Sequence, residues 1–438
     1  MAAMNNGLVS RREILKTALR AGAVAAAPQI IPGSALGLNG AVPPSDRVTL
    51  GGLGIGSRGA SVLRSFLSES DVQFLAICDV RNERREAIKS LADQTYGNRD
   101  CAMYSDQEEL WARKDIDAVL IATGDRWHAL LSIMTARSGK DVYCEKPCSM
   151  TIAESRALAD TFQRLGRIYQ AGTQRRNGPN FVRAFELARG GKLGKLQTLH
   201  AEAGPGDRWA PLTTHDWLPA EPEPPKQVCD WDRWLGPSPW RPYNSQYVQG
   251  RWRGYFDFHG GGILEWGSHT ADLCQWVGDL DGTAPVEYEP QGMGSNTPYS
   301  IHCRYANGIR LVLRDKGFLG LGSCHIRWEG DAGWVETADS GKIEVSENLR
   351  GERLEIAPEE ARLATANHVR DFVNCVKSRR QPRSNALAAG EAHIASHAAY
   401  IAFQLGRKLT FDPATDTFIG SDEANRMRSR AMREPWRI

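Results

Sequence analysis

Apolar and polar positions in the first third of the chain follow a pattern that alternates between strands and helices. Short apolar runs bounded by turn residues predict buried strands, and longer segments with apolar residues three and four positions apart predict helices between them. The predicted strands are 47–53, 72–78, 118–122 and 141–144, and the predicted helices are 60–66, 83–94 and 128–138. Repeated strand–helix units of this kind predict a parallel, doubly wound sheet.

The pattern changes after residue 172. A helix is predicted at 180–189, and the alternating segments beyond it are joined by hairpin signals at Tyr305–Gly308 and Asp339–Gly341. We therefore expect an α/β protein whose second half is an α+β domain built on an open, mostly antiparallel sheet. Between the two patterns, residues 230–243 are rich in tryptophan and proline, and we predict that they form an ordered loop over the functional site.

The N-terminal segment has features of an export signal. Arg11 and Arg12 stand in the run Ser10–Lys16 and precede an alanine-rich, mildly apolar stretch at 17–27, which resembles a twin-arginine signal. An amphipathic helix with a chance arginine pair is the alternative, because Ile14 stands where phenylalanine is usual. This stretch and all later windows fall short of the roughly 18 consecutive apolar residues that a membrane span needs. We expect an exported, periplasmic protein whose mature form does not enter the membrane.

Composition and charge narrow the functional classes. A chain of 438 residues suits two domains plus short appendages. The 54 basic and 52 acidic side chains nearly cancel, so no net field recruits nucleic acid, and a small, uncharged substrate fits this balance better. The nine cysteines lack paired C-x-x-C spacing, which argues against a disulfide framework and a zinc site and predicts buried free thiols.

A glycine-rich turn follows the first predicted strand and opens the first predicted helix. Gly54, Gly56 and Gly59 satisfy G-x-G-x-x-G, and Asp79 lies 20 residues after the last of them, at the end of the next strand. Such glycines allow a tight turn, a close approach to a pyrophosphate and close helix packing, while the acidic residue accepts ribose hydroxyl protons. Asp79 favours NAD over NADP, although Arg81 and Arg84 nearby weaken that preference. The predicted cofactor contacts here are Gly54, Gly56, Ser57, Arg58, Gly59, Asp79 and Arg81.

Two further segments follow the third and fourth predicted strands: Ile121–His128 and Tyr143–Pro147, the latter containing Glu-Lys-Pro. Together with the glycine turn they resemble the Gfo/Idh/MocA oxidoreductases, with Gly124 in place of that family's usual proline. The resemblance implies that Lys146 lies beside the nicotinamide and the substrate hydroxyl. It also implies cofactor contacts by Thr123, Trp127, His128, Glu145 and Lys146.

The segment Gly260–Asp272 resembles the family's G-G-x-x-x-D-x-G-x-H-x-x-D. Glu265 stands where aspartate is usual, and His269 follows four positions later, so the two side chains share one face of a helix. We expect His269 to take the hydroxyl proton and Glu265 to orient or charge-balance His269. Asp272 is expected to support or orient the site and not to react. Glu-x-x-x-His without a second clustered His or Cys is a poor ligand set, so we expect no metal.

Gln174 and Arg175 match a family position that faces the active site. They are candidate binders of substrate hydroxyl or carboxylate groups, with a structural role as the alternative. The closing region 422–436 is similar to the tails of exported planctomycete-type members. The predicted segments are an export-signal region at 1–38, a linker at 39–46, a dinucleotide-binding Rossmann domain at 47–171, a catalytic domain at 172–410 and a tail at 411–438.

The leading functional hypothesis is hydride transfer between NAD and a carbinol carbon of a sugar or polyol, with Lys146 polarising the oxygen. An NAD-dependent glycosidase, which oxidises a sugar transiently and eliminates its glycosidic bond, is the first alternative. Export favours it, because an exported enzyme has no ready supply of fresh cofactor. A sugar-binding or sensory module is the second alternative, against which Lys146 and His269 argue. We expect a small sugar or glycoside as substrate and a homo-oligomer.

Overall fold

The computed structural model describes residue 38 and residues 42–204, 212–292, 298–351 and 367–438. The chain divides into two units, Met1–Arg47 and Val48–Ile438. In the first unit a short 3-10 helix, η3 (Pro44–Asp46), is described, and the predicted twin-arginine segment lies outside the described residues. Among the described helices, none has the length and apolar character needed to cross a membrane. The following paragraphs concern the second unit.

Residues 48–171 form a six-stranded parallel sheet with strand order β3-β2-β1-β4-β5-β6. The order reverses direction at β1, as in doubly wound sheets that bind ligands at this point. Two of these strands are absent from the sequence prediction because each has only three residues, too few to show a hydrophobic pattern. The strands are β1 (Val48–Leu53), β2 (Val72–Cys78), β3 (Ala102–Tyr104), β4 (Ala118–Ile121), β5 (Asp141–Cys144) and β6 (Tyr169–Ala171).

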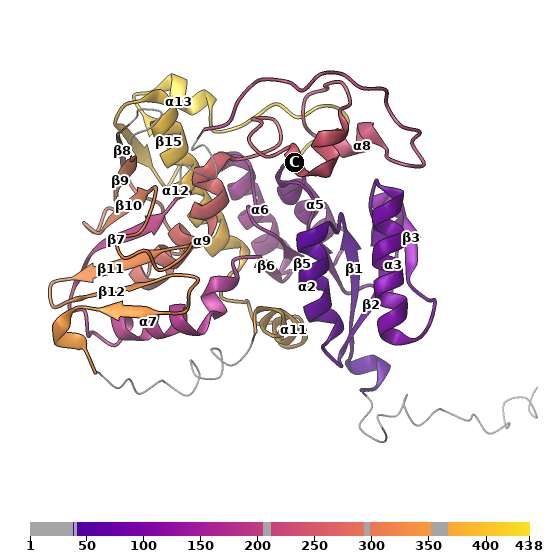
Figure 1. Ribbon diagram of the computed structural model, residues 1–438, viewed down its shortest axis with the longest axis horizontal. Coiled ribbons are helices and arrows are strands. Elements are labelled where there is room, and N and C mark those ends of the chain that lie inside the picture. Colours follow the sequence, from indigo (N-terminus) through magenta and orange to yellow (C-terminus); the bar gives the residue numbers. More distant parts are fainter. Residues whose placement is uncertain (1–37, 39–41, 205–211, 293–297, 352–366) are drawn as a thin grey trace, which may run out of the picture. The chain divides into compact units, whose positions relative to one another are not determined.

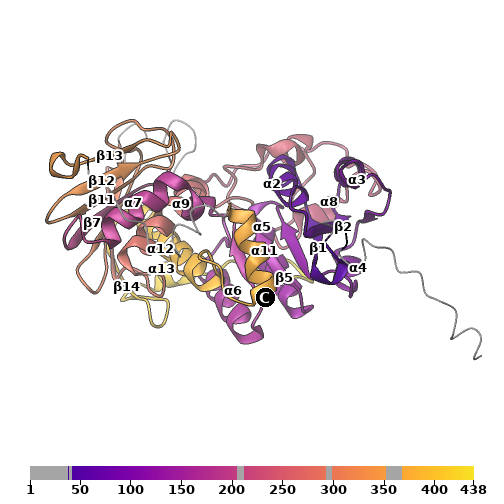
Figure 2. The same cartoon turned by 90° about the horizontal axis from the view of Figure 1, so that it is seen from below.

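Helices cover both faces of this sheet, because its central strands are apolar on both sides. One face packs against α2, α3 and α11, and the other against α4, α5, α6 and the start of α12. Figure 2 shows α2 and α3 on one side of the strands and α4 and α6 on the other. These helices are α2 (Ser57–Leu67), α3 (Asn82–Tyr96), α4 (Gln107–Trp111), α5 (Asp125–Arg137), α6 (Ile152–Leu165), α11 (His368–Ser378) and α12 (Ala386–Leu405).

Helix α5 starts three residues earlier than predicted. Gly124 is its N-cap and the acidic Asp125 its first residue, a placement that the helix dipole favours. His128 therefore lies within the first turns of the helix and not at its start.

The second half is built on a nine-stranded sheet with order β13-β12-β11-β7-β10-β9-β8-β14-β15 (Figure 1). Among the described strand pairings of this second sheet, only β7–β10 is parallel. This confirms the predicted α/β fold with a mostly antiparallel second sheet. The strands are β7 (Leu196–Glu202), β8 (Glu287–Gln291), β9 (Ser300–Arg304), β10 (Arg310–Arg314), β11 (Ile326–Gly330), β12 (Trp334–Thr337), β13 (Ile343–Val345), β14 (Leu409–Asp412) and β15 (Thr417–Ile419).

The second sheet buries one face under three helices, α7 (Pro179–Arg189), α9 (Gly261–Gly278) and α12. The predicted hairpins join β9 to β10 and β12 to β13. Residues of the predicted tail add β15 to this sheet and then form a short helix. The remaining short helices are η4 (Gln174–Asn177), α8 (Trp231–Leu235), η5 (Tyr247–Arg251), η6 (Glu347–Leu349) and α13 (Asp422–Arg426).

Helix α12 connects the two halves, since it packs against α6 of the first half and α9 of the second. A buried ion pair lies within the second half: Arg176 donates from Nε and Nη2 to both carboxylate oxygens of Asp272, at 2.7 and 2.8 Å. All nine cysteines are buried free thiols.

Candidate functional site

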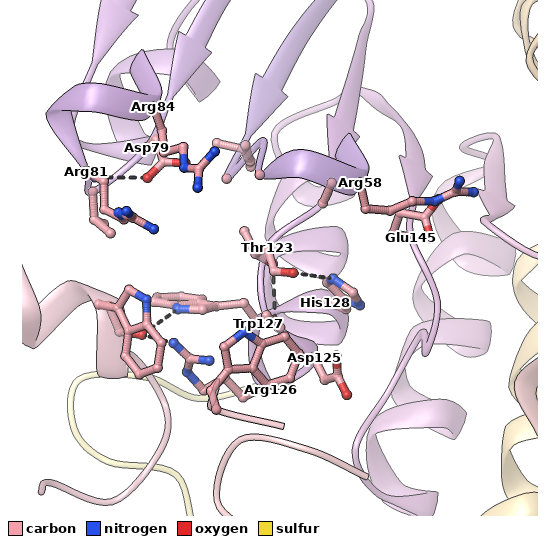
Figure 3. Close-up of a pocket in the computed structure, with 18 of the residues that line it drawn as sticks. Arg58, Asp79, Arg81, Arg84, Thr123, Asp125, Arg126, Trp127, His128 and Glu145 are labelled. Atoms are coloured by element: carbon pink, nitrogen blue, oxygen red, sulfur yellow. Dashed lines mark hydrogen bonds and ion pairs between the residues drawn. The ribbon is translucent and has the colours of Figure 1, made fainter. Parts of the chain in front are cut away.

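A cavity of about 440 Å³ opens at the carboxyl ends of the parallel strands. Gly54, Asp79, Thr123 and Glu145 follow β1, β2, β4 and β5, and all four line it, as doubly wound sheets place their ligands. Figure 3 shows Asp79, Arg81 and Arg84 toward one end of this cavity and His128 and Glu145 toward the other.

The three glycines of the turn have three different physical roles. Gly54 has φ +63, which L side chains rarely adopt, and a Cβ there would lie 2.1 Å from Thr123 Cγ2. A Cβ on Gly59 would lie 2.7 Å from Cβ of Ala122, so this glycine permits helix α2 to pack closely. A Cβ on Gly56 would meet nothing within 4 Å, although Gly56 lines the cavity at the N-terminus of α2. This open cradle fits a dinucleotide pyrophosphate, with Ser57 and Arg58 beside it.

Asp79 is buried at the end of β2. Burial raises the pKa of its carboxyl to about 6, while a hydrogen bond from the Arg81 amide and the charge of Arg81 oppose that rise. The Arg81 guanidinium is directed elsewhere, since it donates to the Val248 carbonyl at 2.6 Å and pairs with Glu83. At this end of the cavity the Asp79 carboxylate is therefore the hydrogen-bond acceptor, with the arginine charges beside it.

His128 holds two strand-end segments together. Its Nδ1 lies 2.7 Å from the Pro147 carbonyl oxygen and its Nε2 lies 3.3 Å from that of Thr123. The neighbouring Trp127 packs edge-on against Trp436, with ring centres 4.8 Å apart. The sequence predicted both residues as cofactor contacts, and both line the cavity, but each also anchors other parts of the chain.

Arg126, which the sequence analysis did not single out, fixes the tryptophan-rich insert over the cavity. Its guanidinium lies 3.8 Å from the centre of the Trp234 ring and donates to the Leu235 carbonyl at 3.2 Å. A Cβ on Gly124 would lie 2.5 Å from Nη1 of Arg126, so a side chain at this position would require the guanidinium to shift. Helix α8 of the insert is ordered, as predicted, and its Arg233 and Trp234 line the cavity.

Lys146 and Glu265 meet across the two halves of the chain. The Lys146 ammonium donates to Oε1 of Glu265 at 2.8 Å and to its backbone oxygen at 3.0 Å. Oε2 of Glu265 lies 3.2 Å from Nε2 of His259. Both Lys146 and Glu265 line the cavity, so the structure brings together the lysine and the acid that the sequence singled out.

The expectation that Glu265 orients His269 is wrong. Nε2 of His269 instead lies 2.9 Å from Nη1 of Arg175, whose guanidinium also pairs with Asp339 at 2.7 Å. His269 is 3% exposed and does not line the cavity; burial and the Arg175 charge lower its pKa well below its usual range. Spacing of four residues places Glu265 and His269 on one face of α9, but a different partner holds each side chain.

The other predicted site residues form a polar network around Glu145. Its Oε1 accepts hydrogen bonds from Arg58 at 3.1 Å and from Gln174 at 2.9 Å. Within the described residues the side-chain oxygen of Gln174 has no partner. The resulting network connects the glycine turn, the Glu-Lys-Pro segment and η4, while Arg175 is engaged by His269 and Asp339.

Asp125 and His259 are functional candidates that the sequence analysis missed. One oxygen or nitrogen of each of Asp125, His259 and Glu265 lies within 4.8 Å of the others. Asp125 is 3% exposed yet lines the cavity, and Figure 3 shows its carboxylate pointing away from Arg126 and Trp127. A local signal existed for both, because Asp125 follows a strand end and His259 immediately precedes the Gly260–Asp272 motif.

Comparison with protein families matches both halves of the chain. Residues 48–173 match the Gfo/Idh/MocA model described as "Oxidoreductase family, NAD-binding Rossmann fold", and residues 206–438 match "Oxidoreductase family, C-terminal alpha/beta domain".

Curated relatives include a "Glycosyl hydrolase family 109 protein" of Shewanella pealeana, 32% identical over 167 residues, covering 37% of this chain and 36% of the relative. Another, of Saccharopolyspora erythraea, is 33% identical over 174 residues, covering 36% of this chain and 38% of the relative. The chain thus matches well under half the length of these relatives.

Solved structures share the fold at low sequence identity. The WlbA dehydrogenase from Bordetella pertussis in complex with NADH and UDP-GlcNAcA has a TM-score of 0.59 and 16% identity, covering 84% of this chain and 98% of that one. The aldose-aldose oxidoreductase from Caulobacter crescentus has a TM-score of 0.55 and 18% identity, covering 83% and 100%.

Proposed function

Because the chain belongs to the Gfo/Idh/MocA oxidoreductase family, we propose that it transfers a hydride between NAD and a carbinol carbon of a sugar or polyol. One observation supports this above the others: a single cavity joins the open Gly56 cradle to the Lys146–Glu265 pair. The bound dinucleotide would supply the hydride acceptor, and the residues of the second half would hold the substrate.

Lys146 is the group that polarises the substrate oxygen. Its ammonium is held by Glu265, whose pKa stays below its usual range despite burial because Lys146 and His259 stabilise the ionised form. The Glu265 carboxylate fixes the lysine side chain in position, which is what stabilisation of a developing alkoxide requires.

We assign NAD and not NADP as the cofactor. The buried Asp79 carboxylate at the end of β2 would repel a 2′-phosphate and accept the ribose hydroxyl protons. Arg81 is engaged by Val248 and Glu83, so its guanidinium is not directed at a phosphate there.

A second candidate function is glycosidic bond cleavage through transient oxidation, in which the hydride returns to the sugar. The names of the curated relatives favour it. So does the insert over the cavity, since a roof held by Arg126 suits a cofactor that stays bound through many turnovers.

The fate of the hydride separates the two candidates. Net oxidoreduction accumulates NADH absorbance when no acceptor sugar is present, whereas cleavage releases a sugar from a glycoside without net NADH. Lys146→Met keeps the side-chain length and removes the charge, so either activity should fall about 10²–10⁴-fold. Lys114→Met, at an exposed lysine outside the cavity, is the matched control. Undiminished turnover by Lys146→Met would refute the proposed role.

We also propose that the protein is exported and forms a homo-oligomer. The Arg11–Arg12 pair supports export, because such pairs are read by a receptor. Arg11→Lys with Arg12→Lys should abolish periplasmic protein in fractionated cells and leave folding intact. Light scattering during gel filtration measures the oligomeric state, and a monomer at all concentrations would contradict that part of the proposal.

A further inference from the structure

Two carboxyl groups from opposite halves of the chain line the same cavity and lie close to each other. Asp125 begins helix α5 and Glu265 lies in helix α9, and both line the cavity. Glu265 accepts one hydrogen bond on each oxygen, from Lys146 on one and from His259 on the other, so each oxygen keeps a further lone pair. Asp125 is 3% exposed, and its Oδ2 has no hydrogen-bond partner within the described part of the chain. The two acids therefore lie close together in contrasting surroundings.

The hydrogen bonds of His259 determine which of its nitrogens carries the proton. Nδ1 accepts from the backbone amides of Gly254 and Gly261, both at 3.1 Å. Nε2 must therefore bear a hydrogen, which it donates to Glu265 at 3.2 Å. The imidazole thus stabilises the ionised form of Glu265.

The same bonds show that Asp125, His259 and Glu265 are poorly suited to a metal ion. A metal on Nε2 would require the hydrogen on Nδ1, where it would face two backbone N–H donors. The Lys146 ammonium, 2.8 Å from Glu265, would also repel a cation there. The cluster is better suited to proton transfer.

The surroundings shift the pKa values of Asp125 and Glu265 in opposite directions. Burial, together with the nearby negative charge of Glu265, raises the pKa of Asp125, while His259, His128 and Arg253 oppose that rise. Burial also acts to raise the pKa of Glu265, but Lys146 and His259 outweigh it and hold that pKa below its usual range. Two neighbouring carboxyl groups separated in this way are the arrangement by which enzymes keep one acid and one base at the same pH.

We propose that Asp125 is the general acid of this site, which donates its proton to the leaving oxygen of a glycoside. The proposal rests on the second candidate function, glycosidic cleavage through transient oxidation. Hydride transfer from an alcohol needs only one group that accepts a proton. A second proton-transfer group, such as Asp125, is needed only when the glycosidic bond also breaks.

The proton balance closes when the oxidation is included. With NAD as the hydride acceptor, oxidation of the substrate hydroxyl releases its proton, which passes through Glu265 to solvent. Glu265, ionised again, then takes the proton from the carbon next to the new carbonyl, a carbon–carbon double bond forms and the bond to the leaving oxygen breaks. Asp125 protonates that oxygen and becomes a carboxylate. Water then adds to the double bond: its hydroxyl joins the former glycosidic carbon, its proton returns to Asp125, and Glu265 gives its proton back to the adjacent carbon. Return of the hydride to the carbonyl carbon, with a proton taken up from solvent through Glu265, restores the hydroxyl, so the net reaction is hydrolysis.

The test is Asp125→Asn, which keeps the shape of the side chain and removes the transferable proton. The probes are methyl and 4-nitrophenyl glycosides of glucose, galactose and their N-acetylamino derivatives. The 4-nitrophenolate leaves without protonation, so its release should fall by no more than a few-fold. Release of methanol should fall about 10²–10⁴-fold. Reduction of bound NAD at 340 nm in a single turnover should stay within a few-fold of wild type.

Three controls keep this result interpretable. Asp100→Asn, at an exposed aspartate outside the cavity, should match wild type on every probe. In the wild-type enzyme the rate of methyl-glycoside cleavage should fall at high pH as the acid loses its proton, and Asp125→Asn should lack that decline. This pH profile tests the wild-type chain directly, even if Asp125→Asn folds poorly.

Equal loss on both glycosides, or slowed NAD reduction in Asp125→Asn, would overturn the assignment while leaving glycosidic cleavage standing. No release of aglycone by the wild-type enzyme from any probe would overturn the assignment together with the cleavage on which it rests. The two failures are distinguishable, because the second appears in the unaltered chain.

Discussion

Replacing Gly56 with alanine should abolish tight cofactor binding while leaving the fold intact. Gly56 has φ −79 and ψ −162, an extended conformation that alanine adopts without strain. A Cβ there meets nothing within 4 Å, so the protein itself gives no reason for a glycine. The remaining reason is a ligand whose phosphates approach the backbone at the start of α2.

Gly56→Ala should change the free energy of unfolding much less than the affinity for NADH. For folding, alanine is a slightly poorer N-cap than glycine but restricts the unfolded chain more, so the free energy of unfolding should change by less than about 1 kcal/mol. For binding, a methyl group in the cradle displaces the pyrophosphate from charge-assisted hydrogen bonds worth about 1.5–3 kcal/mol each. The Kd for NADH should therefore rise about 10- to 150-fold.

Isothermal titration of NADH into nucleotide-free protein measures the affinity, and urea unfolding measures stability. Gly97→Ala is the control, because it should lower stability and leave cofactor affinity unchanged. Gly97 ends helix α3 with φ +67 and has open space around it, so alanine should cost about 1–2 kcal/mol of stability and leave binding unchanged. Affinity of Gly56→Ala within twofold of wild type would refute the reasoning, as would a loss of binding that merely follows unfolding.

Three further predictions concern specificity, packing and pH. Asp79→Ala should weaken NADH binding about 10-fold and narrow its advantage over NADPH in titration calorimetry; an unchanged ratio of the two affinities would contradict this. Arg176→Met leaves the buried Asp272 unpaired and should cost about 3–5 kcal/mol in urea unfolding, whereas Arg189→Met, at an exposed arginine 4.0 Å from Asp279, should cost under 1 kcal/mol. Although burial opposes it, Arg370 and Lys377 hold the pKa of Asp71 at about 2, below its ordinary 3.8. Asp71 therefore stabilises the fold above about pH 4, and this contribution is lost as the pH falls through 2. Asp71→Asn should lower the Tm at pH 7, and the difference from wild type should shrink progressively as the pH falls from 4 through 2.

The sequence by itself determined those features that depend on neighbouring residues. A short apolar run, a glycine turn and a helix form one continuous piece of chain, so the cofactor turn at Gly54–Gly59 follows from local spacing. The same holds for the hairpins of the second sheet, where turn residues join adjacent strands. Strands of three residues, β3 and β6, escaped prediction, because pairing with neighbours in the sheet and not their own pattern stabilises them.

Only the tertiary structure decided which side chains act together. Glu265 and His269 are neighbours on one helix, yet Glu265 pairs with Lys146 and His259 while His269 pairs with Arg175. Asp125 enters the same cavity from the other half of the chain, 140 positions away from Glu265 in sequence. Helical spacing determines the direction in which a side chain leaves the backbone. Its protonation and its partner depend on burial and on charges from distant segments, which come together only when the two sheets pack around α12.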